Sequence, residues 1–332
     1  MKDVSIVIVN YRGWPSLVKC LSSLSAITDN RFSLEVVVVD NNSNDGMFNQ
    51  FSRNYPDFIF VENEGNFGFG HGCNLGASKS TGQYLLFLNP DTLASAEAIF
   101  ELLCEVKSRK PNSIISCLQQ NKNGSFERPY KRFLSPATIT GWTRAINRLI
   151  VGDEAKLVPQ TDKYIYPDWV SGSVFMLSRS AYDDLSGWDD DYWMYFEDVD
   201  LCFRARQKGG EIVVLKSVVI EHLHGGTTRL NKKVTALTKT CVNISRHVYI
   251  SKHEKGIRAG YMQSFLVVNN LIFGFFPAIA GVLLCFIGSL NVASRTYGRL
   301  AYYYLNALKT GTWISPRSVN QKSSKSSLSS TD

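Results

Sequence analysis

The sequence predicts an α/β fold, a Rossmann-like mixed sheet flanked by helices, and three observations predict it. Val4–Val9 and Leu34–Val39 are near-continuous β-branched runs, which is typical of strands buried on both faces. Trp14–Ile27, between them, carries apolar residues at helical spacing. Two more apolar runs, Phe58–Val61 and Tyr84–Leu88, follow. The first hundred residues are therefore predicted to form a doubly wound, nucleotide-binding half.

The later elements are less regular. The glycine-rich stretch 63–82 is expected to form a loop that enters a short helix. Residues 120–168 show no clean period and are expected to form a long, partly irregular insertion across the open face. The remaining expected elements are a strand over Val170–Leu177, a helix over Phe196–Lys208 and a strand over Glu211–Val219.

Charge is distributed unevenly along the 332 residues, whose net charge is +7. Residues 1–226 carry 22 basic and 27 acidic side chains, whereas residues 227–332 carry 14 and 2. An acidic body followed by a basic, partly apolar tail favours an anionic membrane surface as partner and argues against nucleic acid. Seven cysteines without a CxxC pair suit free thiols in the cytoplasm.

Residues 265–290 carry no charge and are long enough to cross a bilayer, which needs about 20 residues. Gly274 and Pro277 are expected to divide the segment, and basic residues flank both of its ends. We therefore expect a re-entrant or interfacial helical hairpin first, a single transmembrane helix second and a buried core pair third. The expected organisation is a catalytic domain over residues 1–226, a helical membrane-associating region over 227–320 and a disordered tail over 321–332.

Polar clusters follow four of the predicted strands: Asn10-Tyr11, residues 40–46, residues 89–91 and Glu221-His222. Open α/β sheets bind ligands beyond the carboxyl ends of their strands, so these clusters are the candidate site. Each alone could be an ordinary helix cap or turn. The spacing of the glycines after Gly65 does not match a dinucleotide-binding loop, and no Walker motif occurs, which disfavours dehydrogenases and P-loop triphosphatases.

Two clusters of polar residues contain the candidate metal ligands and the candidate general base. Asp91 follows a purely apolar strand and is a candidate ligand for Mg²⁺ or Mn²⁺ on phosphate, with His222 as second ligand and His224 as its competitor. The acidic residues between Asp189 and Asp200 alternate with aromatic side chains, a pattern that suits a sugar-binding surface with a general base. Arg204 and Arg206 are expected either to neutralise phosphate or to pair with these acids.

Seven strings, in this order, resemble the family 2 glycosyltransferases of the GT-A fold, particularly their bacterial rhamnosyltransferase branch. They are VSIVIVNYRG, VVVVDNNSNDG, NEGNFGFGHGCNLG, LFLNPDT, VSGSVFMLSR, GWDDDYWMYFEDVDLCFRARQKG and IEHLHGG. Together they span residues 4–226.

The resemblance implies a role for each matching residue. Asp198, paired with Glu197, would be the general base, and Asp91 with His222 would hold a divalent cation, Asn89 standing at the first position of the family's acidic motif. The implied nucleotide-binding residues are Asn10, Tyr11, Asp40, Asn66, Gly68 and Asn74, with Asp40 on the pyrimidine base. The implied acceptor-binding residues are Gly172, Trp188 and Asp189.

The activity implied by this resemblance is inverting transfer of a sugar from a nucleotide-diphospho-sugar to a saccharide acceptor, linked to polyprenyl diphosphate, at the cytoplasmic face of the inner membrane. L-rhamnose from dTDP-rhamnose is the expected donor sugar, in O-antigen or capsule synthesis. Galactofuranose, glucose, galactose and N-acetylglucosamine remain open alternatives. A sugar-nucleotide pyrophosphorylase is disfavoured because NYRGW stands where its phosphate loop would be. A noncatalytic, membrane-bound carbohydrate-binding protein is the alternative of another class.

Overall fold

A computed structural model describes residues 1–152, 158–223, 231–284 and 286–321. The expected tail, apart from Gln321, and His224 lie outside the described residues. Contacts divide the chain into two compact units. The first contains residues 1–133, 154–189 and 197–226, and the second contains residues 134–153, 190–196 and 227–332. Two short segments of the first 226 residues thus pack with the C-terminal helices.

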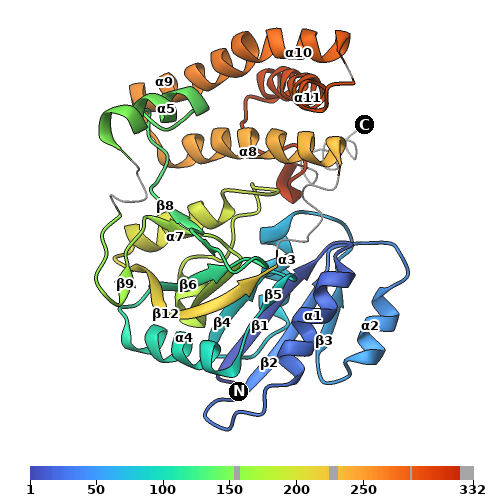
Figure 1. Ribbon diagram of the computed structural model, residues 1–332, viewed down its shortest axis with the longest axis vertical. Coiled ribbons are helices and arrows are strands. Elements are labelled where there is room, and N and C mark those ends of the chain that lie inside the picture. Colours follow the sequence, from blue (N-terminus) through green and yellow to red (C-terminus); the bar gives the residue numbers. More distant parts are fainter. Residues whose placement is uncertain (153–157, 224–230, 285, 322–332) are drawn as a thin grey trace, which may run out of the picture. The chain divides into compact units, whose positions relative to one another are not determined.

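The first unit is built on a mixed ten-stranded sheet (Figure 1). Its main path runs β3-β2-β1-β4-β11-β6-β12-β5, with β7 beside β6 and β9 beside β12, while β8 and β10 form a separate pair. The strands are β1 (Val4–Asn10), β2 (Leu34–Asp40), β3 (Ile59–Glu62), β4 (Tyr84–Leu88), β5 (Thr92–Leu93), β6 (Ile114–Gln120), β7 (Phe126–Glu127), β8 (Tyr130–Lys131), β9 (Tyr164–Ile165), β10 (Trp169–Val170), β11 (Val174–Ser178) and β12 (Ile212–His222).

Helices cover both faces of this sheet, because its central strands are apolar on both sides. The helices are α1 (Trp14–Ser25), α2 (Phe48–Asn54), α3 (Phe69–Ser78), α4 (Ala96–Ser108), α6 (Arg179–Asp184) and α7 (Glu197–Gln207). Leu21 of α1 and Leu102 of α4 belong to one core, and Ala77 of α3 and Leu201 of α7 belong to the core on the other face. The predicted α/β fold is confirmed.

The sheet carries the predicted polar clusters to one edge. β1, β2, β3 and β4 are parallel. β11 is antiparallel to both β4 and β6, and β12 is parallel to β6, so β12 runs in the same direction as β4. Asn10, Asp40 and His222 therefore end their strands on the same edge, and Asp91 follows the end of β4 there. The strand order reverses between β1 and β4, the place where such sheets bind ligands.

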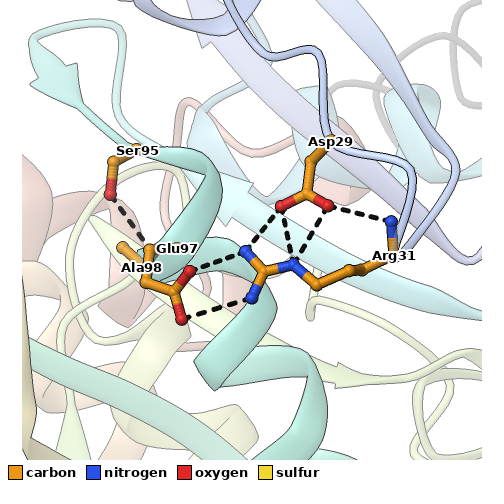
Figure 2. Close-up of polar contacts among 5 residues, drawn as sticks. All are labelled: Asp29, Arg31, Ser95, Glu97 and Ala98. Carbon is orange, nitrogen blue, oxygen red and sulfur yellow. Dashed lines mark hydrogen bonds and ion pairs between the residues drawn. The ribbon is translucent and has the colours of Figure 1, made fainter.

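An arginine clamp holds the loop before β2 against α4 (Figure 2). Arg31 donates to Asp29 and to Glu97, each at 2.6 Å, and its guanidinium lies 4.0 Å from the centre of the Phe100 ring. Ser95 caps the same helix by accepting a hydrogen bond from the backbone of Ala98 at 3.2 Å. The clamp is exposed and fixes a loop rather than a site.

One expectation about the middle of the chain is wrong. The expected strand over Val170–Leu177 is broken at residues 171–173, because β10 pairs with β8 whereas β11 continues the main sheet. The insertion over 120–168, which was expected to be partly irregular, includes three short strands and the helix α5 (Gly141–Val151), which begins with a Thr140–Thr143 capping box. No residue of α5 is buried, although its apolar residues recur at helical spacing.

The second unit consists of helices. They are α5, α8 (Lys232–His253), α9 (Gly256–Val268), the π-helical turn η3 (Asn269–Phe273), α10 (Gly274–Leu283) and α11 (Gly288–Thr310). α9, η3 and α10 form one helical run, Gly256–Leu283, which is long and apolar enough to cross a membrane by length and composition. Its most apolar window is only 17% buried, which disfavours the third expectation of a buried core pair.

The expected break at Gly274 and Pro277 is wrong. Pro277 lies inside α10, and the carbonyl its ring would crowd belongs to Phe273, the last residue of the wide π turn. A hairpin forms further on instead, where α10 gives way to α11. A Cβ atom on Gly281 would come within 2.0 Å of the backbone oxygen of Leu290, so glycine permits the two arms of the hairpin to touch.

The same run has a polar side that faces the unit's interior. The buried His247 of α8 lies 3.0 Å from the hydroxyl of Tyr304, to which Asn270 also donates at 2.8 Å, and the Gln263 amide donates to the backbone oxygen of His247 at 2.9 Å. His247 also stacks on Trp313, with centroids 4.8 Å apart. The run is therefore fastened along one side while its phenylalanines remain exposed on the other.

Candidate active site

The ends of β1 and β2 are locked together by Asp40. Its carboxylate is 1% exposed and accepts hydrogen bonds from the Asn10 amide at 3.1 Å and from the backbone and hydroxyl of Ser43 at 2.8 and 2.6 Å. Ser43 in turn holds Arg12, whose φ of 54° marks a tight turn. Asp40 and Asn10 thus shape the turn, and Tyr11 is exposed beside it. Binding of the nucleotide base by Asp40 stays a prediction.

The glycine-rich stretch serves close packing as well as the site. Asn41 donates to the backbone oxygen of Gly68 at 2.9 Å and lies 3.4 Å from the Asn66 amide oxygen, which ties this loop to the end of β2. Gly68 has a φ of 108°, so glycine is needed there. A Cβ on Gly76 would lie 2.4 Å from Val7, so α3 lies directly against β1.

Asn74 has a structural role in this arrangement. Its amide oxygen accepts from the backbone of Trp188 at 2.9 Å and from the Tyr182 hydroxyl at 2.5 Å, and its amide nitrogen donates to the Trp188 oxygen at 2.8 Å. The Asn74 side chain therefore connects α3 to the segment before α7 by hydrogen bonds. Nucleotide binding by Asn74 stays a prediction that its hydrogen bonds do not favour.

Asp91 and His222 lie together at the carboxyl edge of β4 and β12. The Nε2 atom of His222 lies 3.1 Å from Oδ1 of Asp91, and its Nδ1 atom lies 2.8 Å from the amide oxygen of Gln119. The pairing of β5 with β12 holds them there, since Thr92 lies opposite His222. Gln119 was not singled out by the sequence, because only the strand pairing brings the end of β6 to this place.

This pair fits a divalent cation. The amide oxygen of Gln119 accepts only, so Nδ1 donates to it, and Nε2 faces the Asp91 carboxylate, where a cation between the two would be stabilised. Neighbouring ligands at about 2.1 Å on an octahedral ion are about 3 Å apart, close to the observed 3.1 Å. Gln119 would be the outer partner that orients the imidazole.

The described residues contain no group of three or more His, Cys, Asp or Glu side chains that could hold a metal. Two protein ligands are nevertheless sufficient where substrate phosphates and water complete the coordination, as is usual for Mg²⁺. Asp91 and His222 are buried, at 7% and 6% exposure.

Glu197 and Asp198, at the start of α7, have different environments. Glu197 is buried, and its Oε2 atom has no partner among the described residues. Burial, together with the charge of Asp198, raises the pKa of Glu197 well above its ordinary value. Asp198 is partly accessible and accepts hydrogen bonds from the backbones of Gly172 at 3.2 Å and Val199 at 2.8 Å. Burial raises the pKa of Asp198 to about 6, so near pH 7 it is the ionised member of the pair.

A short chain of hydrogen bonds connects the two halves of the site. Gly172, which donates to Asp198, precedes Ser173, and Ser173 exchanges hydrogen bonds with Gln119 at 2.8 and 3.0 Å. Gln119 orients His222. The break in the strand at residues 171–173 is what allows this backbone to turn between β10 and β11 and serve both sides.

Trp188 belongs to the core beneath the site. It is 1% exposed and is packed against the rings of Phe69, Phe87 and Phe175, so it offers no free face for stacking on a sugar. Its indole nitrogen has no partner among the described residues. Asp189, the next residue, is only half-buried. Acceptor binding by Gly172, Trp188 and Asp189 stays a prediction, in which the burial of Trp188 disfavours ring stacking.

The two arginines of α7 form ion pairs with acidic side chains of the protein. Arg204 forms an ion pair with the buried Asp200 at 2.7 Å and donates to the backbone oxygen of Gly187 at 2.9 Å. Arg206 pairs with Asp168. Of the two roles expected for these arginines, the structure supports pairing.

Comparison with known proteins decides the family. The model of glycosyl transferase family 2 matches residues 5–185, more than half of the chain. The chain belongs to glycosyl transferase family 2. This confirms the resemblance carried by the seven sequence strings, and the protein is a glycosyltransferase.

The similar proteins include two rhamnosyltransferases and a hexosyltransferase. The N-acetylglucosaminyl-diphospho-decaprenol L-rhamnosyltransferase of Mycobacterium tuberculosis is 30% identical over 67% of this chain and 76% of that protein. The low-salt glycan biosynthesis hexosyltransferase Agl10 of Haloferax volcanii is 28% identical over 68% of this chain and 67% of that protein. Rhamnosyltransferase WbbL of Escherichia coli is 25% identical over 62% and 78%.

Two solved structures of glycosyltransferases have the same fold. The mannosyltransferase PcManGT from Pyrobaculum calidifontis, in complex with GDP-Man and Mn²⁺, matches with a TM-score of 0.52 at 17% identity, over 98% of this chain and 80% of that one. GalNAc-T7 with UDP, GalNAc and Mn²⁺ matches with a TM-score of 0.51 at 16% identity, over 81% of this chain and 55% of that longer one. The predicted GT-A fold is thereby confirmed.

Proposed function

We propose that this glycosyltransferase moves L-rhamnose from dTDP-rhamnose to a saccharide linked to polyprenyl diphosphate, with inversion at the anomeric carbon. One observation supports the catalytic part of this proposal. A partly accessible, ionised Asp198 is connected to the Asp91–His222 cluster by a chain of hydrogen bonds through Gly172, Ser173 and Gln119. The donor and acceptor rest on the mycobacterial relative, whose name describes rhamnose transfer to a decaprenol-linked sugar.

The proposed chemistry needs a base and a stabilised leaving group. Asp198 takes the proton of the acceptor hydroxyl as its oxygen bonds to the anomeric carbon and the bond to the nucleotide diphosphate breaks. A pKa of about 6 suits this role, because the carboxylate is ionised near neutral pH and still basic. Glu197, kept protonated beside it, adds no second negative charge. A cation held by Asp91 and His222 would neutralise charge on the departing diphosphate.

The turn around Asp40 and the loop at Asn66 and Gly68 are proposed to receive the nucleotide, since both lie at the carboxyl edge of the central strands. Tyr11 is 37% exposed there and offers a ring for contact with the base. In this proposal Asp40 contributes to nucleotide binding both by direct contact and by holding the turn that receives the nucleotide.

We also propose that the protein works at the cytoplasmic face of a bacterial inner membrane, bound through the helical unit. Exposed side chains along one helical run support this, among them Ile272, Phe273, Phe276 and Val282, which are 55 to 71% exposed. Basic residues flank the run, as suits anionic lipid. The buried polar contacts of Asn270 and Gln263 favour a run that lies in the interface over one that spans the bilayer.

The test is a panel of nucleotide sugars presented to purified protein with membranes and with a polyprenyl-diphosphate-linked N-acetylglucosamine. Transfer of rhamnose from the dTDP donor, dependent on Mg²⁺ or Mn²⁺ and lost in Asp198→Asn, is the expected result. Preference for another donor would replace rhamnose in this proposal and leave the proposed mechanism unchanged. Donor binding without any transfer would reject the catalytic proposal in favour of a carbohydrate-binding role.

A further inference from the structure

Phe69 lies where the glycine-rich loop enters α3. It is the first residue of that helix and follows Gly68, whose φ is 108° and whose backbone oxygen accepts a hydrogen bond from the Asn41 amide at 2.9 Å. The half-buried Phe69 ring packs edge-on against Trp188, with ring centroids 5.6 Å apart. The side chain therefore extends from the loop proposed to receive the nucleotide to the core beneath the site.

The same ring lies close against Gly172. A Cβ atom on Gly172 would lie 3.0 Å from Cε1 of Phe69 and 3.4 Å from Cη2 of Trp188. The first of these separations is closer than ordinary contacts of a Cβ atom, and Gly172 does not have a positive φ. Glycine is therefore needed at this position because of the two rings and not because of its backbone conformation.

Gly172 in turn holds the proposed base. Its backbone N–H donates to Oδ2 of Asp198 at 3.2 Å. The other oxygen, Oδ1, accepts from the backbone of Val199, the next residue of α7, at 2.8 Å. The bond from Gly172 thus fixes the carboxylate relative to a segment outside α7, which the bond from Val199 does not. The place of a base matters, because an error of about 1 Å can lower a rate about 100-fold.

We propose that Phe69 positions the general base: its ring, together with that of Trp188, fixes the Gly172 backbone, whose N–H orients Asp198. The inference rests on the proposed function, which takes Asp198 as the base. Phe69 acts here through Gly172, so it is a positioning residue and not a catalytic one. Because Phe69 directly follows Gly68, the loop proposed to receive the donor also sets the place of the base.

The first test compares Phe69→Leu with Phe100→Leu in the full chain, with the donor that the panel of nucleotide sugars identifies. Leucine lacks the ring atom that faces Gly172, so Phe69→Leu should lower kcat about 10-fold while KM for the donor changes less than about 3-fold. Phe100 is the matched control, because it is also half-buried and also packs on an aromatic ring, that of Phe32 at 6.2 Å. Equal effects of the two variants on kcat would overturn the inference.

A second set of variants shows whether Phe69 acts through the base. In an Asp198→Asn background, which has no base to position, Phe69→Leu should leave the residual transfer rate unchanged. Gly172→Ala should lower kcat on its own, because the added Cβ atom meets the Phe69 ring, and adding Phe69→Leu to it should raise kcat about 3-fold or more. A loss in the Asp198→Asn background as large as that in wild type, or no recovery in the double variant, would contradict the inference.

Hydrogen exchange gives a readout that does not depend on sugar transfer. The Gly172 amide, followed by nuclear magnetic resonance, should exchange about 10-fold faster in Phe69→Leu than in wild type or in Phe100→Leu, and unchanged exchange would overturn the inference. Transfer that requires Asp198, with the same kcat in Phe69→Leu and wild type, would overturn the inference and keep the proposed function. Absence of transfer by the wild-type protein, with faster exchange in Phe69→Leu, would reject the proposed function and keep the hold of Phe69 on Gly172.

Discussion

The Nε2 atom of His222 lies 3.1 Å from Oδ1 of Asp91, although 131 positions separate the two residues in the chain. The two are brought together by the antiparallel pairing of β5 and β12 at the carboxyl edge of β4. Gln119 fixes the orientation of the imidazole from the other side at 2.8 Å. The arrangement leaves an imidazole nitrogen and a carboxylate oxygen at the separation of two ligands of one cation.

Asp91→Asn should weaken Mn²⁺ binding in the presence of a nucleoside diphosphate and reduce transfer accordingly, because it removes the only negative charge of the pair. Gln119→Met should weaken Mn²⁺ binding about 10-fold or more by releasing the imidazole. Titration with Mn²⁺ followed by electron paramagnetic resonance measures both. Asp29→Asn, a carboxylate in the exposed Arg31 clamp, serves as the control. Equal Mn²⁺ affinity in wild type and Asp91→Asn would remove Asp91 from the metal site.

Transfer should depend on a group with a pKa of about 6, because Asp198 must be ionised to accept a proton. The rate should be constant above pH 7 and fall about 10-fold for each unit below pH 6. Asp198→Asn should lower kcat by 100-fold or more, an order of magnitude typical of general bases, while donor binding is retained. A transfer rate that begins to fall only below pH 4.5 would show that burial does not raise the pKa of Asp198. Wild-type turnover by Asp198→Asn would overturn the assignment of the base.

The sequence predicted the first four strands and the places of the polar residues that follow them, because both depend on local pattern, whereas β6 in the middle of the sheet was not predicted. β1, β2 and β4 are continuous apolar runs, and Asp40 and Asp91 follow directly after them. Gln119 and Ser173 could not be predicted in the same way, since their roles depend on which strands become neighbours. Trp188 was expected to face a sugar because it stands among acids, but its burial depends on three phenylalanines from distant segments.

The helical unit shows a second limit of local pattern. Pro277 normally interrupts a helix, yet the π turn ending at Phe273 lets the apolar run continue. Helix α5 was not predicted, although Trp142, Ile146 and Ile150 recur four residues apart within its sequence, and it buries none of them.

Binding to anionic vesicles should depend on the exposed side of α10. Phe276→Glu places a charge on a side chain that is 71% exposed and should lower the partition coefficient for vesicles of phosphatidylglycerol about 10-fold or more, given the cost of burying a charge and the loss of an aromatic contact. Phe126→Glu, at 61% exposure on β7 of the first unit, is the matched control and should leave partitioning near wild type. Co-sedimentation measures both, and equal losses would argue against docking through α10.

Contact between the arms of the hairpin should make Gly281 intolerant of any side chain. A Cβ atom there would lie 2.0 Å from the Leu290 backbone oxygen, so Gly281→Ala forces α10 away from α11 and should cost roughly 1–3 kcal/mol of unfolding free energy. Gly298→Ala is the matched control, because a Cβ atom there has open space within α11. It should instead stabilise the helix by roughly 0.5–1 kcal/mol. Thermal unfolding of the two variants in detergent-free buffer would give melting temperatures that shift in opposite directions, and a neutral Gly281→Ala would show that the arms do not touch.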